Sequence, residues 1–217
     1  VNNEPAPLTL RVNTARVTMD DARARLAAEG VETEPCLHAP HALTVTAGNP
    51  MGTSLHAEGL VALMDEASQL VGALAAAALS GTVLDACAAP GGKTLVLACD
   101  MRAGSRVVAA DRRPRRVSLL TRSLARFGLD VPVIQHDLAA GAPFRDLDGV
   151  LVDAPCSGLG TIRRDPDIRW RRAEADLGPL AAAQLRLLHA AADAVRPGGR
   201  VVYATCSSEP EENEQVA

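Results

Sequence analysis

The sequence VLDACAAPGGKT at residues 83–94 decides the fold of this chain. It joins a short apolar run to a turn of small residues and then to the start of a helix-compatible segment. Pro90, Gly91 and Gly92 let backbone N–H groups approach a ligand closely, and the helix start beyond them favours a carboxylate or a phosphate. Taken alone, this segment also fits an ordinary glycine turn that caps a helix.

Apolar runs and helix-compatible stretches alternate on both sides of this turn. Helices are predicted between most of the runs, at residues 94–101, 114–127 and 173–195. This alternation predicts an α/β domain with a mostly parallel sheet, helices on both faces, and ligands bound beyond the carboxyl ends of the strands. The runs themselves lie at residues 83–84, 106–110, 131–135, 149–152 and 200–203. Five functional side chains stand at or just past these strand ends: Asp85, Asp111, Asp137, Asp153 and Cys206.

The first fifty residues predict a separate small α/β unit. Strands are expected at residues 8–12 and 42–46, with a helix at residues 19–29 between them. A segment rich in Gly, Pro and Thr follows and is typical of a domain boundary. We therefore divide the chain into a small unit at residues 1–48 and a main domain at residues 49–217.

Composition limits the classes of protein to consider. The chain has 217 residues, 47% hydrophobic and 22% charged, which is typical of a globular protein. Its net charge of −4 means that any nucleic-acid site must be a local patch. The five cysteines form no C-x-x-C pair, which favours reduced thiols in a cytoplasmic protein over a disulfide framework. We expect a monomer without a metal site.

An uncharged stretch between Glu66 and Asp85 resembles a membrane span in length. It is rich in alanine, and Ser80, Gly81 and Thr82 interrupt it. A buried helix that leads into a strand fits this pattern better than a span, so no membrane contact is expected.

Lys93 is the middle residue of a GKT triplet that is also found in P-loops. A P-loop requires a glycine five positions before Gly92, and Cys87 stands there instead, which argues against a nucleotide hydrolase. Lys93 is the only lysine among 22 basic residues. It indicates either a site that needs a compact ammonium group or a chance lysine.

Two further segments place cysteines at strand ends. DAPCSGLGTIRRDPDIRW at residues 153–170 carries Cys156, and YATCSSEPEENE at residues 203–214 carries Cys206. A lone cysteine after a strand is more often a small buried hydrophobic residue than a nucleophile. Two cysteines at neighbouring strand ends, facing the same turn, make that interpretation much weaker.

Together these three segments resemble the signature motifs of the Nol1/Nop2/Sun family of RNA cytosine-5 methyltransferases, in particular its bacterial group acting on small-subunit ribosomal RNA. The likeness runs in order from about residue 8 to the C-terminus. MDEASQLV at residues 64–71 is similar to a family segment that usually begins with Gln, where this chain has Met64. The resemblance implies a Rossmann-like, S-adenosylmethionine-dependent methyltransferase fold preceded by a small RNA-recognition-like α/β unit.

The resemblance also implies roles for individual residues. Cys206 is the expected nucleophile and Cys156 the helper that releases the product. Asp153 and Lys93 are expected to engage the cytosine base. Asp111, at a strand end, suits the ribose hydroxyls of an adenosine cofactor, and Asp137 suits the adenine, although either could be a simple cap. Residues expected to bind S-adenosyl-L-methionine are Cys87, Ala88, Ala89, Pro90, Gly91, Gly92, Lys93, Asp111, Asp137 and Asp153.

RNA, with ribosomal RNA as the first candidate, is the expected partner. Arg163, Arg164 and Arg169 lie beside Cys156 and are predicted to contact it, with Trp170 as a packing or stacking group. A second cluster of four arginines at residues 112–116 is expected to be an ordinary solvated helix face.

Several alternatives remain at this level. The enzyme could methylate tRNA or another RNA, or the chain could be an RNA-binding scaffold without catalysis. A DNA cytosine methyltransferase would use Cys156 as nucleophile and leave Cys206 without a role, and methyltransferases acting on proteins or small molecules need neither thiol. Family members continue into further strands beyond residue 217. We therefore expect an unprotected sheet edge, and a higher melting temperature for a longer chain.

Overall fold

The computed structural model describes residues 5–217, which form two sheets. The first sheet is antiparallel, with strand order β2-β3-β1-β4. Its strands are β1 (Thr9–Val12), β2 (Glu32–Pro35), β3 (Ala42–Ala47) and β4 (Val61–Leu63). The second sheet is parallel, with strand order β7-β6-β5-β8-β9. Its strands are β5 (Thr82–Asp85), β6 (Arg106–Asp111), β7 (Val133–Gln135), β8 (Leu147–Asp153) and β9 (Val195–Ala204).

The N-terminal unit packs helix α1 (Met19–Ala28) against the first sheet. Thr18 begins the helix, because its hydroxyl accepts a hydrogen bond from the backbone N–H of Asp21. The buried side chains of Leu10, Leu26 and Leu43 belong to one apolar cluster between the two elements. The predicted helix and both predicted strands are confirmed.

The sequence analysis missed β2 and β4. β2 is the exposed edge strand ETEP, with too little apolar content to predict a strand, and β4 has three residues. β4 pairs with β1 and so belongs to the first sheet, although it follows the predicted boundary at residue 48. Short helix α2 (Ser54–Ala57) lies between β3 and β4.

The central strand β5 organises the second sheet. β6 and β7 lie on one side of β5. The chain then crosses over to the other side of β5, where it forms β8 and β9, so the order in which strands are added to the sheet switches between β5 and β8. Ligands of such sheets bind beyond the carboxyl ends of the strands at this switch. β7 begins at Val133 rather than at the predicted residue 131, since Pro132 has no N–H to donate to a ladder.

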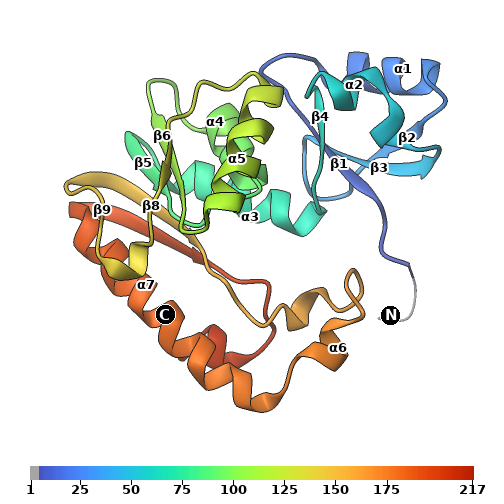
Figure 1. Cartoon of the computed structure of the whole chain (residues 1–217). Coiled ribbons are helices and arrows are strands. Elements are labelled where there is room, and N and C mark those ends of the chain that lie inside the picture. The colour runs from blue at the N-terminus through green and yellow to red at the C-terminus, as the bar shows by residue number, and fades with distance from the viewer. Residues whose placement is uncertain (1–4) are drawn as a thin grey trace.

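Helices cover both faces of this sheet, as predicted (Figure 1). Alternate strand residues point to opposite faces, so Leu84 and Val150 pack with α7, whereas Val83 and Leu151 pack with the opposite helices. Helix α7 (Leu177–Ala194) lies on one face. The other face carries α3 (Glu66–Ala78), α4 (Gly92–Asp100) and α5 (Pro114–Phe127). The small helix α6 (Ile168–Arg171) belongs to the long connection after β8.

The uncharged stretch after Glu66 forms α3 and leads into β5, as expected. Ala75, Ala76 and Leu79 are buried against the sheet in this region. Within residues 5–217, none of the helices has the length and apolar character that crossing a membrane requires.

Buried polar contacts join the N-terminal unit to the main domain. Arg11, 1% exposed on β1, forms an ion pair with Asp100 at the end of α4, with 2.7 Å between its Nη2 and the carboxylate Oδ1. Asn13 donates through Nδ2 to the carbonyl oxygen of Phe127 over 2.8 Å. Gln69 on α3 donates to the carbonyl oxygen of Leu10. The two sheets are therefore fixed relative to each other.

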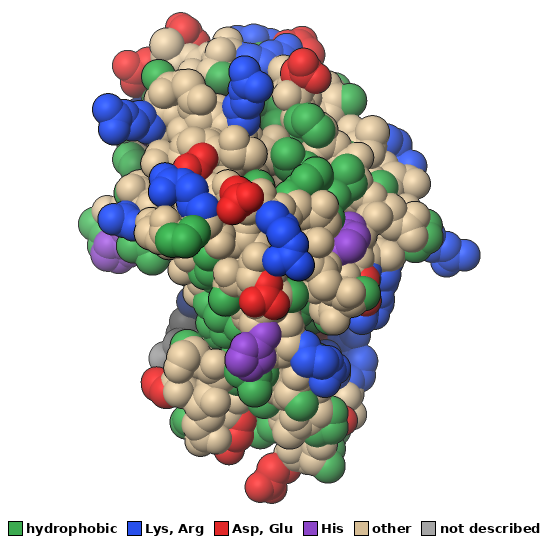
Figure 2. All heavy atoms as spheres, turned by 90° about the vertical axis from the view of Figure 1, so that its left-hand side faces the viewer, with side chains coloured by type: hydrophobic (Ala, Val, Ile, Leu, Met, Phe, Trp, Pro, Cys, Tyr) green, Lys and Arg blue, Asp and Glu red, His purple; other side chains and the backbone are tan. Residues whose placement is uncertain are grey.

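The end of the sheet at which β8 begins, near Asp146, carries charges of both signs. Figure 2 views the molecule from this side and shows basic and acidic side chains interspersed. Arg196 and Asp148 form an ion pair there, with 2.7 Å between Nε and Oδ1. The candidate site lies at the opposite ends of the strands.

Candidate active site

The turn between β5 and α4 holds its backbone open toward the carboxyl ends of the strands. Gly91 caps α4 with a φ of 109°, a conformation that favours glycine. A Cβ atom on Gly91 would lie 3.1 Å from Leu120, and one on Gly92 would lie 3.2 Å from the sulfur of Met64. Neither position has room for a side chain without movement. Met64, the departure from the family pattern, thus packs against the start of α4.

Asp85 ends β5, directly before this turn, and the sequence predicts no specific role for it. Its side chain is fully buried, and Oδ2 accepts a hydrogen bond from the Thr94 hydroxyl at 2.7 Å. No described group bonds its Oδ1. Burial raises the pKa of Asp85 to about 7, and the nearby charge of Asp153 adds to the effect, while the Thr94 bond opposes it. The position of Asp85 at a strand end was the available signal.

Asp111 ends β6, and its side chain is 7% exposed. Its Oδ1 accepts from the backbone N–H of Arg113 at 3.0 Å, and its Oδ2 lies 3.0 Å from Nε of Arg116. Arg116 also donates to the carbonyl oxygen of Ala89 in the glycine turn. The expectation of a purely solvated arginine face at residues 112–116 is therefore wrong for Arg116, which ties Asp111 to the turn.

Asp137 follows β7 and caps a short turn of 3-10 helix. Its Oδ1 accepts from the backbone N–H of Ala139 at 3.1 Å. The capping alternative considered for this residue is thus present, and a contact with a bound adenine stays a prediction. Cys87, also expected near the cofactor, packs its side chain against the sheet core. Burial raises the pKa of Cys87 to about 12, so its thiol stays protonated.

Lys93 and Asp153 connect the glycine turn to the cysteine loops. Nζ of Lys93, in the first turn of α4, lies 2.7 Å from Oδ2 of Asp153 at the end of β8. The two side chains are 15% and 34% exposed, so the ion pair is partly screened from water. The structure therefore brings together the only lysine of the chain and the aspartate of the DAPC segment.

Cys156 and Cys206 meet across the ends of β8 and β9. Their sulfur atoms are 2.9 Å apart, and the backbone N–H of Cys206 lies 3.2 Å from Sγ of Cys156. The hydrogen bond from Cys156 lowers the pKa of Cys206 to about 7, against the effects of burial and Asp153 and with help from Lys93. The same bond, together with burial, raises the pKa of Cys156. These opposite pKa shifts favour Cys206 as the more acidic thiol of the pair.

A cavity of about 580 Å³ opens beside these groups. Lys93, Asp153 and Cys206 line one part of it, and Pro7 and Thr9 of the N-terminal unit line another. A space of this size matches small-ligand sites. The N-terminal unit therefore contributes directly to the wall of the site.

Arg163 and Arg164, predicted to bind RNA, line the same cavity and bond to groups of the protein. Arg163 donates to the carbonyl oxygen of Pro5 at 3.0 Å, and Arg164 donates to that of Pro7 at 3.1 Å. Arg164 also forms an ion pair with Asp65 at the start of α3. These bonds tie the loop after β8 to the N-terminal segment. The predicted RNA contact of the two arginines is not tested by these bonds.

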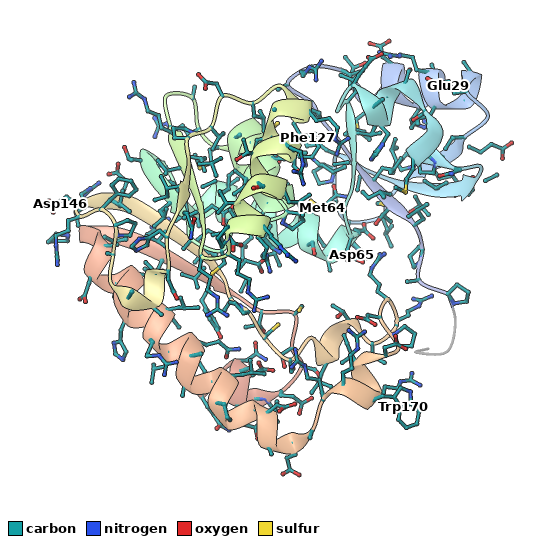
Figure 3. The ribbon with its side chains drawn as sticks, in the orientation of Figure 1. Glu29, Met64, Asp65, Phe127, Asp146 and Trp170 are labelled. Atoms are coloured by element: carbon teal, nitrogen blue, oxygen red, sulfur yellow. The ribbon has the colours of Figure 1, made fainter. Side chains whose placement is uncertain are left out.

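The remaining part of the arginine cluster lies on α6. Arg169 is exposed, and Trp170 is 87% exposed with its side chain directed away from the rest of the molecule (Figure 3). Trp170 therefore contributes little to the packing of the chain. The stacking role considered for it stays a prediction.

Sequence reasoning also missed the groups that hold the cysteine loops. Glu212 is fully buried, and its carboxylate accepts hydrogen bonds from Ser157 and Gln184. The segment EPEENE contains four glutamates, and nothing in its pattern distinguishes the buried one from its neighbours.

Comparison with known proteins assigns this site to a family. Residues 74–217 match the family described as 16S rRNA methyltransferase RsmB/F, and residues 1–52 match the ferredoxin-like domain of RsmF/B-like methyltransferases. The chain belongs to this methyltransferase family. The predicted membership of the Nol1/Nop2/Sun family is confirmed, as is the Rossmann-like methyltransferase fold with a small N-terminal unit, here a ferredoxin-like domain.

Named relatives of the family support the match along the chain. The chain is 38% identical, over 98% of its length, to "Probable ribosomal RNA small subunit methyltransferase B" of Bacillus subtilis and covers 48% of that protein. It is also 38% identical, over 98% of its length, to "Ribosomal RNA small subunit methyltransferase B" of Vibrio cholerae and covers 50% of it. The chain therefore spans about half the length of the curated relatives it matches.

Solved structures agree with the fold. A methyltransferase homologue from Pyrococcus horikoshii has a TM-score of 0.81 and 32% identity, with 99% of this chain and 69% of that chain covered. NSun6 from the same organism, solved with SFG, has a TM-score of 0.86 over 99% of this chain and 79% of that chain. Its identity is 19%, so it supports the fold alone.

Family membership confirms S-adenosyl-L-methionine as the cofactor. The structure fits this group at three points. The turn at Gly91 and Gly92 exposes backbone where a Cβ would be crowded, Asp111 presents a carboxylate at a strand end, and buried Asp85 has an oxygen without a described partner. A nucleoside with a charged amino-acid tail requires such a combination of open backbone and carboxylates.

Proposed function

We propose that this chain transfers a methyl group from S-adenosyl-L-methionine to carbon 5 of a cytosine in RNA, with Cys206 as the covalent nucleophile. The observation that carries the proposal is the pair of thiols 2.9 Å apart beside the Lys93–Asp153 ion pair. A methyltransferase that acts on oxygen or nitrogen atoms of a small molecule does not need a thiol adduct, and such an enzyme would leave both cysteines unused.

Carbon 5 of cytosine is too electron-poor to accept a methyl group unaided. Attack of the Cys206 thiolate on carbon 6 converts the ring into an enamine-like nucleophile and divides one difficult step into easier ones. The lowered pKa of Cys206, about 7, supplies this thiolate near neutral pH. Bound S-adenosyl-L-methionine supplies an electrophilic methyl group.

Asp153 and Lys93 are placed to hold the base during this attack. They line the cavity together with Cys206, and their ion pair fixes both side chains. We assign Asp153 to the N3 or amino edge of the cytosine, where it orients the base while the added thiolate places negative charge on the ring. The ion pair with Lys93 orients the Asp153 carboxylate.

Cys156 completes the reaction by elimination. In the adduct the Cys206 sulfur bonds carbon 6 and carries no charge, so the main cause of the raised pKa of Cys156 is removed. Cys156 then loses its proton to solvent, and its thiolate takes the proton from carbon 5. The electron pair of that carbon–hydrogen bond restores the ring double bond, and the carbon 6–sulfur bond breaks to return Cys206 as a thiolate.

Small-subunit ribosomal RNA is the substrate we propose, from the names of the relatives. The target cytosine must be unstacked to reach the cavity. Local positive charge near the cavity comes from three arginines on a chain of net charge −4. Arg163 and Arg164 line the cavity, and Arg169 lies on α6 in the same connection. A monomeric, cytoplasmic enzyme is part of the same proposal.

Incubation with tritiated S-adenosyl-L-methionine and total ribosomal RNA tests this function, with tRNA in a parallel reaction. We expect label in 5-methylcytidine after nucleoside analysis of the ribosomal RNA. Label in the tRNA alone would support the alternative substrate. Label in another nucleoside would remove the cytosine-5 reaction, and a chain that binds RNA without transferring label would be a scaffold.

A further inference from the structure

The two cysteine loops are joined to each other through a short segment that follows β9. Glu212 and Asn213 are neighbours in this segment, and each side chain bonds a different loop. Glu212 reaches the loop that carries Cys156, and Asn213 reaches the loop that carries Cys206. None of the roles assigned so far uses these two residues.

Glu212 bonds the residue that follows Cys156. Its Oε1 accepts from the backbone N–H of Ser157 at 2.9 Å and from Nε2 of Gln184 at 2.8 Å, and its Oε2 accepts from the Ser157 hydroxyl. Gln184 also donates to the carbonyl oxygen of Pro155, on the other side of Cys156. Cys156 is thus held from both neighbours.

Asn213 bonds the residues on both sides of Cys206. Its Oδ1 accepts from the Thr205 hydroxyl at 2.9 Å, and its Nδ2 donates to the carbonyl oxygen of Ser207 at 3.2 Å. The loops also touch directly, because the hydroxyls of Ser157 and Ser207 are 3.1 Å apart and the N–H of Gly160 donates to the carbonyl oxygen of Cys206.

Glu212 is an unusual group for a buried position. Its side chain is fully buried, and within residues 5–217 its hydrogen-bond partners are the neutral donors of Ser157, Ser207 and Gln184. Burial would raise its pKa, yet hydrogen bonds from Ser157, Ser207 and Gln184 keep it below the ordinary value, so the group is ionised. A buried carboxylate without a basic partner is costly for a fold even when it is hydrogen-bonded, and apolar residues of similar volume often cost less.

We propose that Glu212 is a positioning residue that, with Asn213, sets the separation of the Cys156 and Cys206 thiols. The proposal rests on the proposed function of this cysteine pair and deepens it. The length of the Glu212 side chain carries the effect, since a single carboxylate must reach Ser157 and Gln184 at the same time. Its charge is secondary.

Two substitutions separate length from charge. Glu212→Asp keeps the charge and shortens the side chain by one carbon, so it cannot reach both partners. Glu212→Gln keeps the length, and its oxygen can still accept from the Ser157 N–H and from Gln184. Glu214→Gln is the matched control, because Glu214 lies in the same segment and is exposed.

The measurement is the rate of Cys206 alkylation by iodoacetamide as a function of pH. Peptide mass spectrometry quantifies alkylation of Cys206 separately from that of the other cysteines. We expect a midpoint near 7 in the unchanged protein, as the pKa of Cys206 requires. Glu212→Asp should move the midpoint up by at least one pH unit, toward the ordinary thiol value of about 8.5. Glu212→Gln and Glu214→Gln should leave it in place.

Each outcome decides the proposal. An unchanged midpoint in folded Glu212→Asp, or an equal shift in Glu212→Gln, overturns it. If Glu212→Asp does not fold, Ser157→Ala decides instead, because it removes the hydroxyl bond to Glu212 together with the contacts of that hydroxyl with Ser207 and the N–H of Leu159. An unchanged midpoint there overturns the proposal as well. Alkylation requires neither RNA nor cofactor. A failure of the proposed methyl transfer would therefore leave this test intact and distinguishable.

Discussion

The carboxyl ends of β5 and β6 differ from those of β8 and β9 in how their functional groups are held. Asp85 and Asp111 are buried and bond groups close to them in sequence, such as Thr94 and Arg113. Cys206 is exposed, and its position depends on contacts from distant segments. The cofactor side is a local strand–turn–helix structure, whereas the cysteine side is assembled by tertiary contacts. Substitutions on the two sides should therefore fail in different ways.

The largest effect is expected from removal of each thiol. Cys206→Ala cannot form the bond to carbon 6 and should give neither methylated RNA nor a covalent complex. Cys156→Ala should still attack and transfer methyl, then stall with the RNA attached through Cys206. A denaturing gel with labelled RNA shows the difference.

The geometry adds a pH dependence to this pair of variants. Without the Cys156 hydrogen bond, the pKa of Cys206 rises from about 7, so Cys156→Ala should form its adduct faster at pH 8.5 than at pH 7. A DNA-type mechanism predicts the reverse assignment of adducts, and a scaffold predicts none. An adduct that survives Cys206→Ala would rule out this assignment of the nucleophile.

On the cofactor side, Asp85→Asn should raise the free energy of unfolding above pH 7, besides any effect on the reaction. The pKa of Asp85 is about 7 in the folded chain and near 3.8 when unfolded, so the folded state holds a proton that the unfolded state has lost between these values. The free energy of unfolding therefore falls as pH rises through this range. Removing the carboxylate should relieve a cost on the order of 4 kcal/mol above pH 7.

Urea denaturation without cofactor at pH 4.5, 6 and 8 checks this expectation. The advantage of Asp85→Asn over the unchanged protein should be smallest at pH 4.5 and largest at pH 8. Thr94→Val serves as the control, since it removes the hydroxyl bond and keeps the buried carboxylate. A difference that does not vary with pH would mean that Asp85 titrates normally.

A smaller effect is expected at Asp111. Asp111→Ala should weaken binding of S-adenosyl-L-methionine by roughly 1.5–3 kcal/mol, the value of a charge-assisted hydrogen bond, without unfolding the domain. Calorimetric titration measures the affinity, and Asp137→Ala provides a comparison at a capping residue. Unchanged affinity in Asp111→Ala would remove this carboxylate from the cofactor site.

The same contrast explains what the sequence could predict. The glycine turn, Lys93 and the strand-end aspartates follow from local patterns. The structure pairs Lys93 with Asp153 and ties Asp111 to the turn through Arg116. β4 was missed because three residues carry no periodic signal, and Glu212 was missed because burial of one glutamate in EPEENE depends on Ser157 and Gln184. Arg116 was assigned to a solvated helix face because its two partners, Asp111 and Ala89, come from other segments.

The smallest effect concerns the arginines beside the cysteine loop, which differ in their place in the structure. Arg169 is exposed on α6, and Arg164 lines the cavity, where it pairs with Asp65. If Arg169 neutralises a phosphate, Arg169→Ala should lower RNA affinity and reduce the slope of log affinity against log salt by about 0.7 for a single strand. Arg164→Ala should change that slope less and slow adduct formation more, because it releases the loop from α3.

The measurement is fluorescence anisotropy with labelled small-subunit RNA at salt concentrations from about 50 to 200 mM. It gives the RNA affinity of each variant and the salt dependence of that affinity. Arg122→Ala, exposed on α5, is the control, and an equal loss there would show that the arginine effect is not local to the site.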